Sequence, residues 1–246
     1  MKKTFLILYI LSISLYSQSF LDQQRKTSRF ITAEKEKMGL IKEMFKSKGL
    51  SFPDIEVYLR VFKNEESLEL WARTGKSDTF VLMRDYHICS NSGNLGPKRR
   101  QGDGQVPEGC YYISQFNPYS NFYLSLGLNY PNESDRIIGG KGNLGGDIFI
   151  HGDCVTIGCI PLTDNYIKEL YVICVYAKNN GQVRIPVHLF PLQLNDAGMT
   201  LLKGYFKDDT LLSFWTNLQK IYNRFNETHA LVRVYVDKKG NYLLKQ

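Results

Sequence analysis

Residues 148–164 read Ile-Phe-Ile-His-Gly-Asp-Cys-Val-Thr-Ile-Gly-Cys-Ile-Pro-Leu-Thr-Asp. The stretch opens with a short apolar run that predicts a strand ending at His151, and Cys159 follows eight residues later, directly after a glycine. A thiol beside an imidazole base is the minimum equipment for acyl transfer through a thioester. Gly158 permits a tight backbone turn that can direct N–H groups at a developing oxyanion. The stretch therefore predicts a cysteine nucleophile with a histidine base.

The simplest alternative is that both residues are structural, since free cysteines are commonly small buried hydrophobes. The surroundings of Cys159 favour chemistry instead. Thr163 is a good N-cap, so a helix is expected to start just after the cysteine. A helix N-terminus and a nearby imidazole together predict a lowered pKa for the Cys159 thiol. Of the other histidines, His87 and His188 are expected to be packed within strands, and His229 to face solvent at a helix exit.

A metal site is a second alternative for His151, Asp153, Cys154 and Cys159. Their spacing, H-x-D-C-x4-C, matches no zinc pattern, because structural zinc sites usually draw on two separated pairs of ligands. The Gly102-Asp103-Gly104 loop lacks the Lys-Ser/Thr that a phosphate-binding loop requires. We therefore predict neither a metal nor a cofactor.

The five cysteines are an odd number, so at least one thiol is expected to stay unpaired. Their spacing does not resemble a disulfide framework. The sequence leaves a Cys89–Cys110 bridge open, and a Cys154–Cys159 bridge would block the predicted nucleophile.

The N-terminus is typical of a secretory signal, with Lys2-Lys3 followed by about a dozen apolar residues and then small polar ones. We expect cleavage near Ser17–Gln18 and hence a protein exported to the periplasm or cell envelope. No apolar run reaches the roughly 20 residues that a membrane span needs, so stable membrane insertion is not predicted.

The formal charge of +7 falls to +5 when Lys2 and Lys3 are removed with the signal. No basic stripe interleaved with aromatic residues accompanies this charge, and with export this argues against nucleic-acid binding. A mild positive charge suits substrates that bear free carboxylates, although solubility would explain it equally well. The sequence does not indicate the oligomeric state.

The hydrophobic periodicity predicts an α+β fold. Helical spacing over residues 27–48, followed by Gly49, predicts an amphipathic helix that packs on the main domain or serves as a stalk. From about Pro53 the period changes to two, which predicts strands at 54–63, 67–73, 79–88, 110–116, 121–128 and 147–151. Loops are expected at 91–109 and 129–146. The remaining expected elements are a helix from Thr163 to Asn180, a strand over 183–189, a helix over 209–228, and a hairpin of 231–236 with 241–245.

These elements suggest three segments: a signal peptide over residues 1–17, an N-terminal helical segment over 18–52, and a catalytic domain over 53–246. The third is expected to be mainly β, a twisted mixed sheet or sandwich with flanking helices.

The chain resembles the L,D-transpeptidase catalytic domain (YkuD) family, and specifically its YafK-like branch. The family signature is a histidine-glycine pair followed by [Ser/Thr]-x-Gly-Cys, which here is His151-Gly152 and Thr156-Ile157-Gly158-Cys159. Residues 102–113 resemble the family segment x-T-P-x-G-x-Y/F-x-I, with Val106 in place of threonine. The resemblance extends over about residues 54–245.

Two departures from the family pattern concern the substrate. Ile157 stands where many members have histidine, and Pro161 stands where many have an arginine that could bind a substrate carboxylate. Arg99 and Lys141 are candidates to supply the missing positive charge, as are the neighbouring Lys98 and Arg100. Thr156 is a further candidate for substrate binding.

The resemblance implies that the substrate is the peptide of the cell wall. Cys159 would attack the carbonyl of the third stem-peptide residue, and His151 would act as general base and acid. The N–H groups of Gly158 and Cys159 would hold the oxyanion, and a backbone carbonyl near Gly152 would orient the imidazole.

The acceptor of the thioester stays open at this point. An amine acceptor makes the chain a cross-linking transpeptidase, whereas water makes it an L,D-carboxypeptidase or an amidase that releases proteins from peptidoglycan. A non-catalytic wall-binding module is a further alternative, which the His151–Cys159 pair disfavours.

Overall fold

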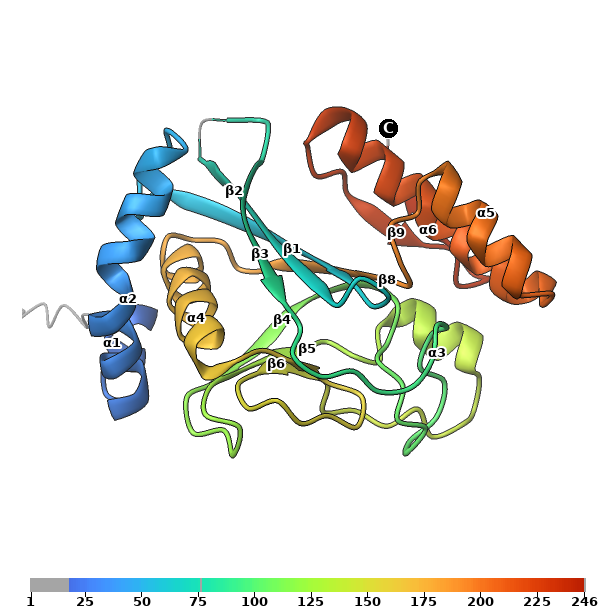
Figure 1. The fold of residues 1–246 in the computed structure, drawn as a ribbon, viewed down its shortest axis with the longest axis horizontal. Helices are drawn as coiled ribbons and strands as arrows, with labels where there is room; N and C mark the ends of the chain where they lie inside the picture. The colour runs from blue at the N-terminus through green and yellow to red at the C-terminus, as the bar shows by residue number, and fades with distance from the viewer. Residues whose placement is uncertain (1–17, 76, 246) are drawn as a thin grey trace, which may run out of the picture.

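The computed structural model describes residues 18–75 and 77–245, and it has an α+β fold as predicted (Figure 1). The helices in this part are α1 (Phe20–Gln24), α2 (Ser28–Ser47), α3 (Glu133–Gly139), α4 (Asp164–Asn179), α5 (Asp196–Tyr205) and α6 (Asp209–Thr228). The strands are β1 (Ile55–Phe62), β2 (Ser67–Thr74), β3 (Val81–His87), β4 (Gly109–Asn117), β5 (Ser125–Leu128), β6 (Phe149–His151), β7 (Ile160–Pro161), β8 (Pro186–Phe190), β9 (Val234–Val236) and β10 (Tyr242–Leu244). The expected signal over residues 1–17 lies outside the described residues.

Eight strands form one mixed sheet in the order β3-β2-β1-β8-β4-β5-β6-β7. The pairs β1–β8 and β6–β7 are parallel, and the other neighbours in this sheet are antiparallel. Strand β1 lies inside the sheet and is buried almost throughout, which explains its nearly continuous apolar sequence. Strands β9 and β10 form a separate hairpin.

Helices cover both faces of the central strands (Figure 1). Helices α1, α2 and α4 lie on one side, where α4 packs against β1 and α2 packs against α4. Helices α5 and α6 lie on the other side with the β9–β10 hairpin. Phe30 and Phe45 of α2 are fully buried in the first core together with Leu59 of β1, so α2 packs on the main domain. The second core centres on Trp215 of α6 and Phe190 of β8.

Most of the expected elements are confirmed. Helices α2 and α6 match the predicted ranges, and the Thr163 hydroxyl caps α4 by accepting from the N–H of Tyr166. The periodicity missed α1, α5, the two-residue strand β7, and helix α3 within the expected loop 129–146. Within residues 18–75 and 77–245, no helix is both long and apolar enough to cross a bilayer.

The histidine predictions met different outcomes. His188 is packed within β8 as expected, with 5% of its surface exposed, and His229 is exposed at the end of α6. The prediction for His87 is wrong: it ends β3, the edge strand of the sheet, and its side chain is exposed.

Candidate active site

Two short parallel strands bring the predicted nucleophile and base together. Strand β6 ends at His151, and β7 begins directly after Cys159. Ile150 pairs with Ile160 and His151 with Pro161. Because neighbouring strands lie about 4.8 Å apart, Cys159 returns beside the strand that carries His151.

The side chain of His151 is buried, with 1% of its surface exposed, and packs against the Phe122 ring at a centroid distance of 4.7 Å. Its Nδ1 is hydrogen-bonded to the carbonyl oxygen of Gly152. A carbonyl can only accept, so Nδ1 carries the proton and Nε2 of the neutral ring is left as the base. Burial lowers the pKa of His151, with the Gly152 carbonyl and the Asp153 charge acting in the opposite direction.

Gly152 is required by close packing around the histidine. A Cβ at this position would lie 2.5 Å from Oδ1 of Asp164 and 2.9 Å from the carbonyl oxygen of Phe122. The same Asp164 oxygen accepts the N–H of Asp153 at 3.0 Å, and this contact fixes the chain just beyond the histidine. The absence of a side chain therefore lets the first turn of α4 approach the backbone that holds His151.

Cys159 is a half-buried, neutral thiol. Its Sγ–H donates to the carbonyl of Asp147 at 3.5 Å. Burial raises the pKa of Cys159, as does the Asp147 charge, while the Phe149 N–H and the positive charge of Lys98 lower it. The expectation of a lowered pKa is therefore wrong, because loss of solvation outweighs the favourable groups.

Thr156 organises the turn that precedes the cysteine. Its Oγ1 accepts from the N–H groups of Gly158 (3.1 Å) and Cys159 (2.8 Å), and it donates to the carbonyl of Cys159 at 2.9 Å. These two N–H groups are the predicted oxyanion donors. Gly158 has a φ of +131°, and a Cβ there would lie 3.0 Å from the carbonyl oxygen of Gln105, so only glycine fits.

A disulfide ties the same loop to the far edge of the sheet. Cys89, just after β3, is bonded to Cys154, with a Cα–Cα distance of 5.4 Å and a sequence separation of 65. The Cys89–Cys110 bridge that the sequence left open is therefore not formed, because the fold brings Cys89 to Cys154 instead, and their spacing gives no sign of this pairing. Cys110, Cys159 and Cys174 are free. The bond occupies the sulfur of Cys154, which removes it from the metal site considered above.

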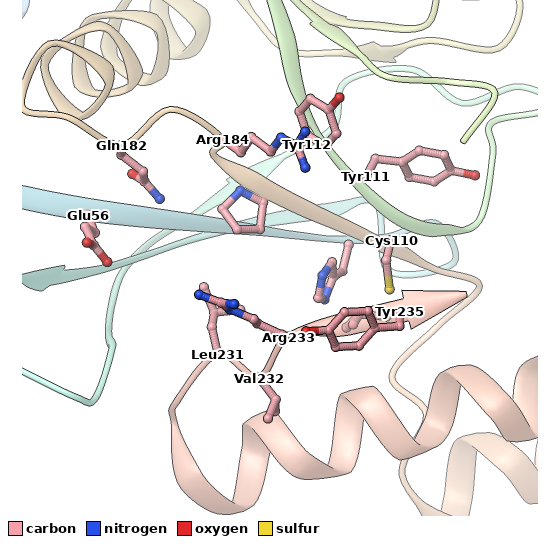
Figure 2. A pocket seen from close by; sticks show the side chains of 13 residues that line it. Glu56, Cys110, Tyr111, Tyr112, Gln182, Arg184, Leu231, Val232, Arg233 and Tyr235 are labelled. Atoms are coloured by element: carbon pink, nitrogen blue, oxygen red, sulfur yellow. The ribbon is translucent and has the colours of Figure 1, made fainter. Parts of the chain in front are cut away.

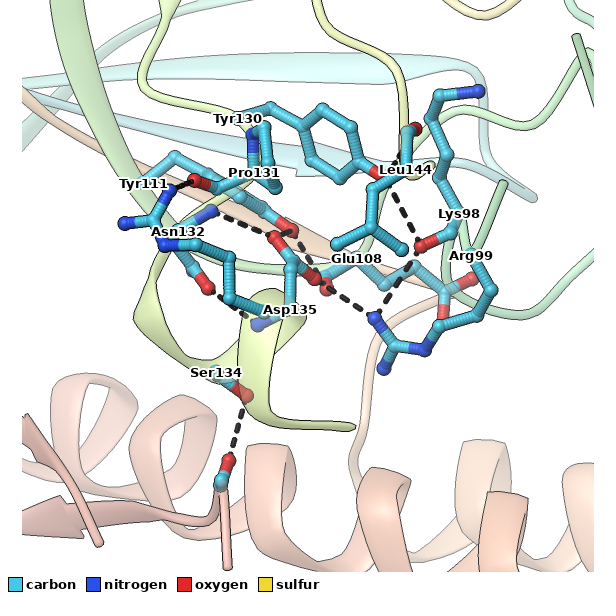
Figure 3. Close-up of polar contacts among 12 residues, drawn as sticks. Lys98, Arg99, Glu108, Tyr111, Tyr130, Pro131, Asn132, Ser134, Asp135 and Leu144 are labelled. Atoms are coloured by element: carbon cyan, nitrogen blue, oxygen red, sulfur yellow. Dashed lines mark hydrogen bonds and ion pairs between the residues drawn. The ribbon is translucent and has the colours of Figure 1, made fainter. Parts of the chain in front are cut away.

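The candidate carboxylate ligands lie in different surroundings. Arg99 is paired with Asp135 at 2.8 Å and belongs to the polar network around α3 that Figure 3 shows. Lys98 is buried and paired with Asp103 at 2.6 Å, yet its charge still acts on Cys159. Lys141 is exposed on the loop after α3.

Sequence reasoning missed Lys63, a buried cation at the end of β1. Its Nζ donates to the carbonyls of Asn94 (2.8 Å), Gly96 (2.9 Å) and Val106 (3.0 Å), and to the Glu108 carboxylate at 2.9 Å. These bonds hold the loop that carries Gln105 against Gly158. A lysine directly after a buried apolar strand was the available signal, because a charge at such a place must be paired.

The comparisons with known proteins identify the class. The family model of the L,D-transpeptidase catalytic domain, YkuD, matches residues 56–187. The chain belongs to this family, which confirms the resemblance inferred from the His151-Gly152 and Thr156–Cys159 motifs.

Among curated proteins, the chain is 36% identical over 193 residues to the Escherichia coli K12 protein named "Putative L,D-transpeptidase YafK". The match covers 77% of this chain and 74% of that protein, and the same values hold for the protein of that name in E. coli O157:H7.

Two solved structures show weaker similarity. The helical cell shape determining protein Pgp2 of Campylobacter jejuni is 15% identical, with a TM-score of 0.44 and coverage of 76% of this chain and 75% of that chain. Bd1075 of Bdellovibrio bacteriovorus is 17% identical, with a TM-score of 0.40 and coverage of 78% and 77%.

Proposed function

We propose that this chain is an exported cysteine L,D-transpeptidase that cross-links or remodels peptidoglycan through a thioester on Cys159. The observation that carries the proposal is the pairing of β6 with β7, which sets Cys159 beside a histidine whose Nε2 is free to accept a proton. Membership of the L,D-transpeptidase family supports the stem peptide as substrate.

The chemistry begins from a neutral thiol and a neutral imidazole. Nε2 of His151 takes the thiol proton as Sγ attacks the carbonyl carbon of the third stem-peptide residue. The C–N bond to the terminal D-amino acid then breaks, and His151 returns the proton to the departing amine. An amine from a second stem peptide attacks the thioester, loses a proton to His151, and regenerates the thiol, which receives that proton. Gly152 serves this cycle by keeping the proton of His151 on Nδ1.

The tetrahedral intermediates are stabilised by the N–H groups of Gly158 and Cys159. Both donate to the Thr156 hydroxyl in the free protein, so the substrate oxygen must replace that hydroxyl as their acceptor. Each such donor typically contributes about 2.7–4 kcal/mol to lowering the barrier. Thr156 thus holds the oxyanion site in shape before substrate enters.

The substrate carboxylate requires a positive partner. Lys141 is exposed on the loop after α3. The positive charge of Lys98 already acts on Cys159. Arg99 can serve only if its ion pair with Asp135 opens.

The alternatives share the thioester and differ in what resolves it. Water in place of the acceptor amine makes the chain an L,D-carboxypeptidase, or an amidase if the leaving amine belongs to a wall-bound protein. A wall-binding module that does not turn over its substrate would not require a free base at Nε2 of His151.

Mass spectrometry of the products formed from purified disaccharide-tetrapeptide tests the proposal. We expect a 3→3-linked dimer with the wild-type protein and none with Cys159→Ala. Cys174→Ala is the matched control, because it removes a fully buried thiol on α4 and should retain activity. Loss of one D-amino acid without a dimer would establish a carboxypeptidase, and turnover by Cys159→Ala would refute the thioester mechanism.

A further inference from the structure

A groove with both polar and apolar lining residues is shown in Figure 2. It has a volume of about 780 Å³ and lies between the β4–β8 part of the sheet and the segment 231–235, which includes the start of β9. Neither Cys159 nor His151 lines it. Its base is formed by Cys110 and His188, which face each other in the antiparallel β4–β8 register.

The hydrogen bonds around His188 define which of its nitrogens carries the proton. Tyr58 is fully buried, and within residues 18–75 and 77–245 its hydroxyl is bonded to Nδ1 of His188 alone, at 2.7 Å. A buried hydroxyl that did not donate here would be left unsatisfied, so Tyr58 donates and Nδ1 accepts. The neutral ring therefore carries its proton on Nε2. Burial keeps the ring neutral, because it lowers the pKa of His188 to about 3 with the help of the nearby Arg60 charge.

The Nε2–H of His188 is available to a ligand. It has no acceptor among the residues that the structure describes. In that same part of the chain, the fully covered side-chain nitrogen or oxygen atom without a partner is Oγ of Ser92, so Nε2 of His188 is not completely covered. Since His188 lines the groove, this N–H provides a donor at its base.

Two guanidinium groups add charge to this donor. Arg184 and Arg233 are exposed and line the groove, and neither forms a side-chain ion pair or hydrogen bond within the described part of the chain. Arg184 rests over the Tyr112 ring, 4.8 Å from its centroid, and this contact limits its motion. The carboxylate that lines the groove, Glu56, is already paired with Arg73 at 2.6 Å.

We propose that this groove binds a carboxylate group of a peptidoglycan stem peptide between Arg184, Arg233 and the Nε2–H of His188. A carboxylate offers about four lone-pair sites and is matched by guanidinium groups, whereas a cation would meet two positive charges and a Glu56 carboxylate that is already paired. The proposal rests on the proposed function for its choice of substrate, and it adds a second attachment point for the wall polymer that takes no part in bond cleavage.

NMR titration of the Cys159→Ala protein tests this inference without turnover. The probe is a free stem tetrapeptide, and the Kd is read from the Nε2–H signal of His188 in histidine-labelled protein. We expect this signal to shift, and the Kd to rise about tenfold in Arg184→Gln/Arg233→Gln, since two charged hydrogen-bond donors are lost. The matched control is Lys203→Gln/Lys207→Gln, with Lys203 on α5 and Lys207 just after it, which removes the same charge away from the groove and should leave the Kd within about twofold.

A second probe isolates the carboxylates. The same tetrapeptide with its carboxyl groups converted to amides should leave the His188 signal unmoved. Equal affinity for both peptides, or equal affinity of the Arg184→Gln/Arg233→Gln protein, would overturn the inference. So would shifts confined to the amides of Gly152 and Gly158, which report the catalytic loop.

Turnover is measured separately, with wild-type protein and disaccharide-tetrapeptide. Turnover without a His188 response means that the groove proposal fails and the enzyme proposal stands. A His188 response without turnover means that the groove binds the peptide and that the enzyme proposal fails.

Discussion

Burial shifts the pKa values of the proposed base and the proposed nucleophile in opposite directions, and both shifts favour the neutral pair. It lowers the pKa of His151, whose charged form is a cation, and raises the pKa of Cys159, whose charged form is an anion. In the proposed mechanism, the thiol therefore becomes nucleophilic only when His151 removes its proton during attack. Such a resting state protects Cys159 from oxidation and alkylation, since the thiolate is the reactive form.

This resting state predicts a defined pH dependence. Protonated His151 cannot accept the thiol proton, so activity is lost as the pH falls through the pKa of His151. Because burial lowers that pKa below the ordinary 6.5, the acid limb of kcat/KM is expected below pH 6.5. A pH–rate profile of disaccharide-tetrapeptide turnover measures it.

The pH dependence of Cys159 alkylation by iodoacetamide gives an independent test of the protonation state of the Cys159–His151 pair. The rate at Cys159 should still rise with pH above the ordinary thiol value of 9.0. An alkylation midpoint below pH 7 would reveal a thiolate–imidazolium pair and contradict the neutral resting state.

At the scale of elements, the loop between β6 and β7 is held from three directions. Thr156 bonds within it, Gln105 presses on Gly158, and the Cys89–Cys154 bond anchors its middle to the end of β3. The loop can therefore keep Cys159 in place although β7 contains only two residues.

Removal of the Cys89–Cys154 disulfide should distinguish its effect on the free energy of unfolding from its effect on the position of the β6–β7 loop. For Cys89→Ser/Cys154→Ser, we expect the free energy of unfolding to fall by about 2–4 kcal/mol, as for other bonds that close long loops. We also expect kcat to fall at temperatures where the variant is still folded, because the catalytic loop loses its anchor. Denaturant unfolding and product assays measure the two effects, with Cys174→Ala as the control. Unchanged kcat in a destabilised protein would show that the bond stabilises the fold alone.

The sequence predicted long periodic elements well and short ones poorly. Helices α2 and α6 span twenty residues each, so their apolar faces repeat often enough to be recognised. Helix α3 has seven residues, and its signal was the Asn132–Asp135 capping box rather than periodicity. Strand β7 and the Cys89–Cys154 bond depend on tertiary pairing, which leaves no local pattern.

The candidate site divides in the same way. The motif around His151 and Cys159 was visible in the sequence, since it lies within one short stretch. The direction of the Cys159 pKa shift could not be predicted from the sequence, because the burial of this side chain depends on segments that are distant in sequence. The Lys63 cluster also escaped prediction, because its acceptors lie on a loop more than thirty residues away.

At the scale of the whole molecule, the N-terminal helical segment and the sheet share one core. Phe45 of α2 is fully buried and contacts Phe52 at a centroid distance of 5.3 Å, and Phe52 in turn contacts Tyr176 of α4 at 4.9 Å. A helix that fills the core in this way is part of the folded unit.

Phe45→Ala should therefore destabilise the entire described chain. We expect a loss of about 3–5 kcal/mol and a single unfolding transition by tryptophan fluorescence, whose probes Trp71 and Trp215 lie outside α2. Leu40→Ala is the matched control, because Leu40 lies on the same helix with 54% of its surface exposed and should change stability by less than about 0.5 kcal/mol. An unchanged unfolding midpoint at the two tryptophans in Phe45→Ala would show that residues 18–52 unfold on their own.

The parallel pairing of β1 with β8 also governs the order of assembly. Leu59 of β1 pairs with Val187 of β8. An interior strand near the start of the chain therefore cannot complete its pairing until a strand from the last third of the chain is present. Closing so long a loop must precede the contacts that reward it, which makes such topologies slow to fold. Until β8 arrives, β1 offers an unsatisfied apolar edge to any neighbour. A chain that emerges from its N-terminus therefore exposes this strand edge to aggregation until residues 186–190 have been made.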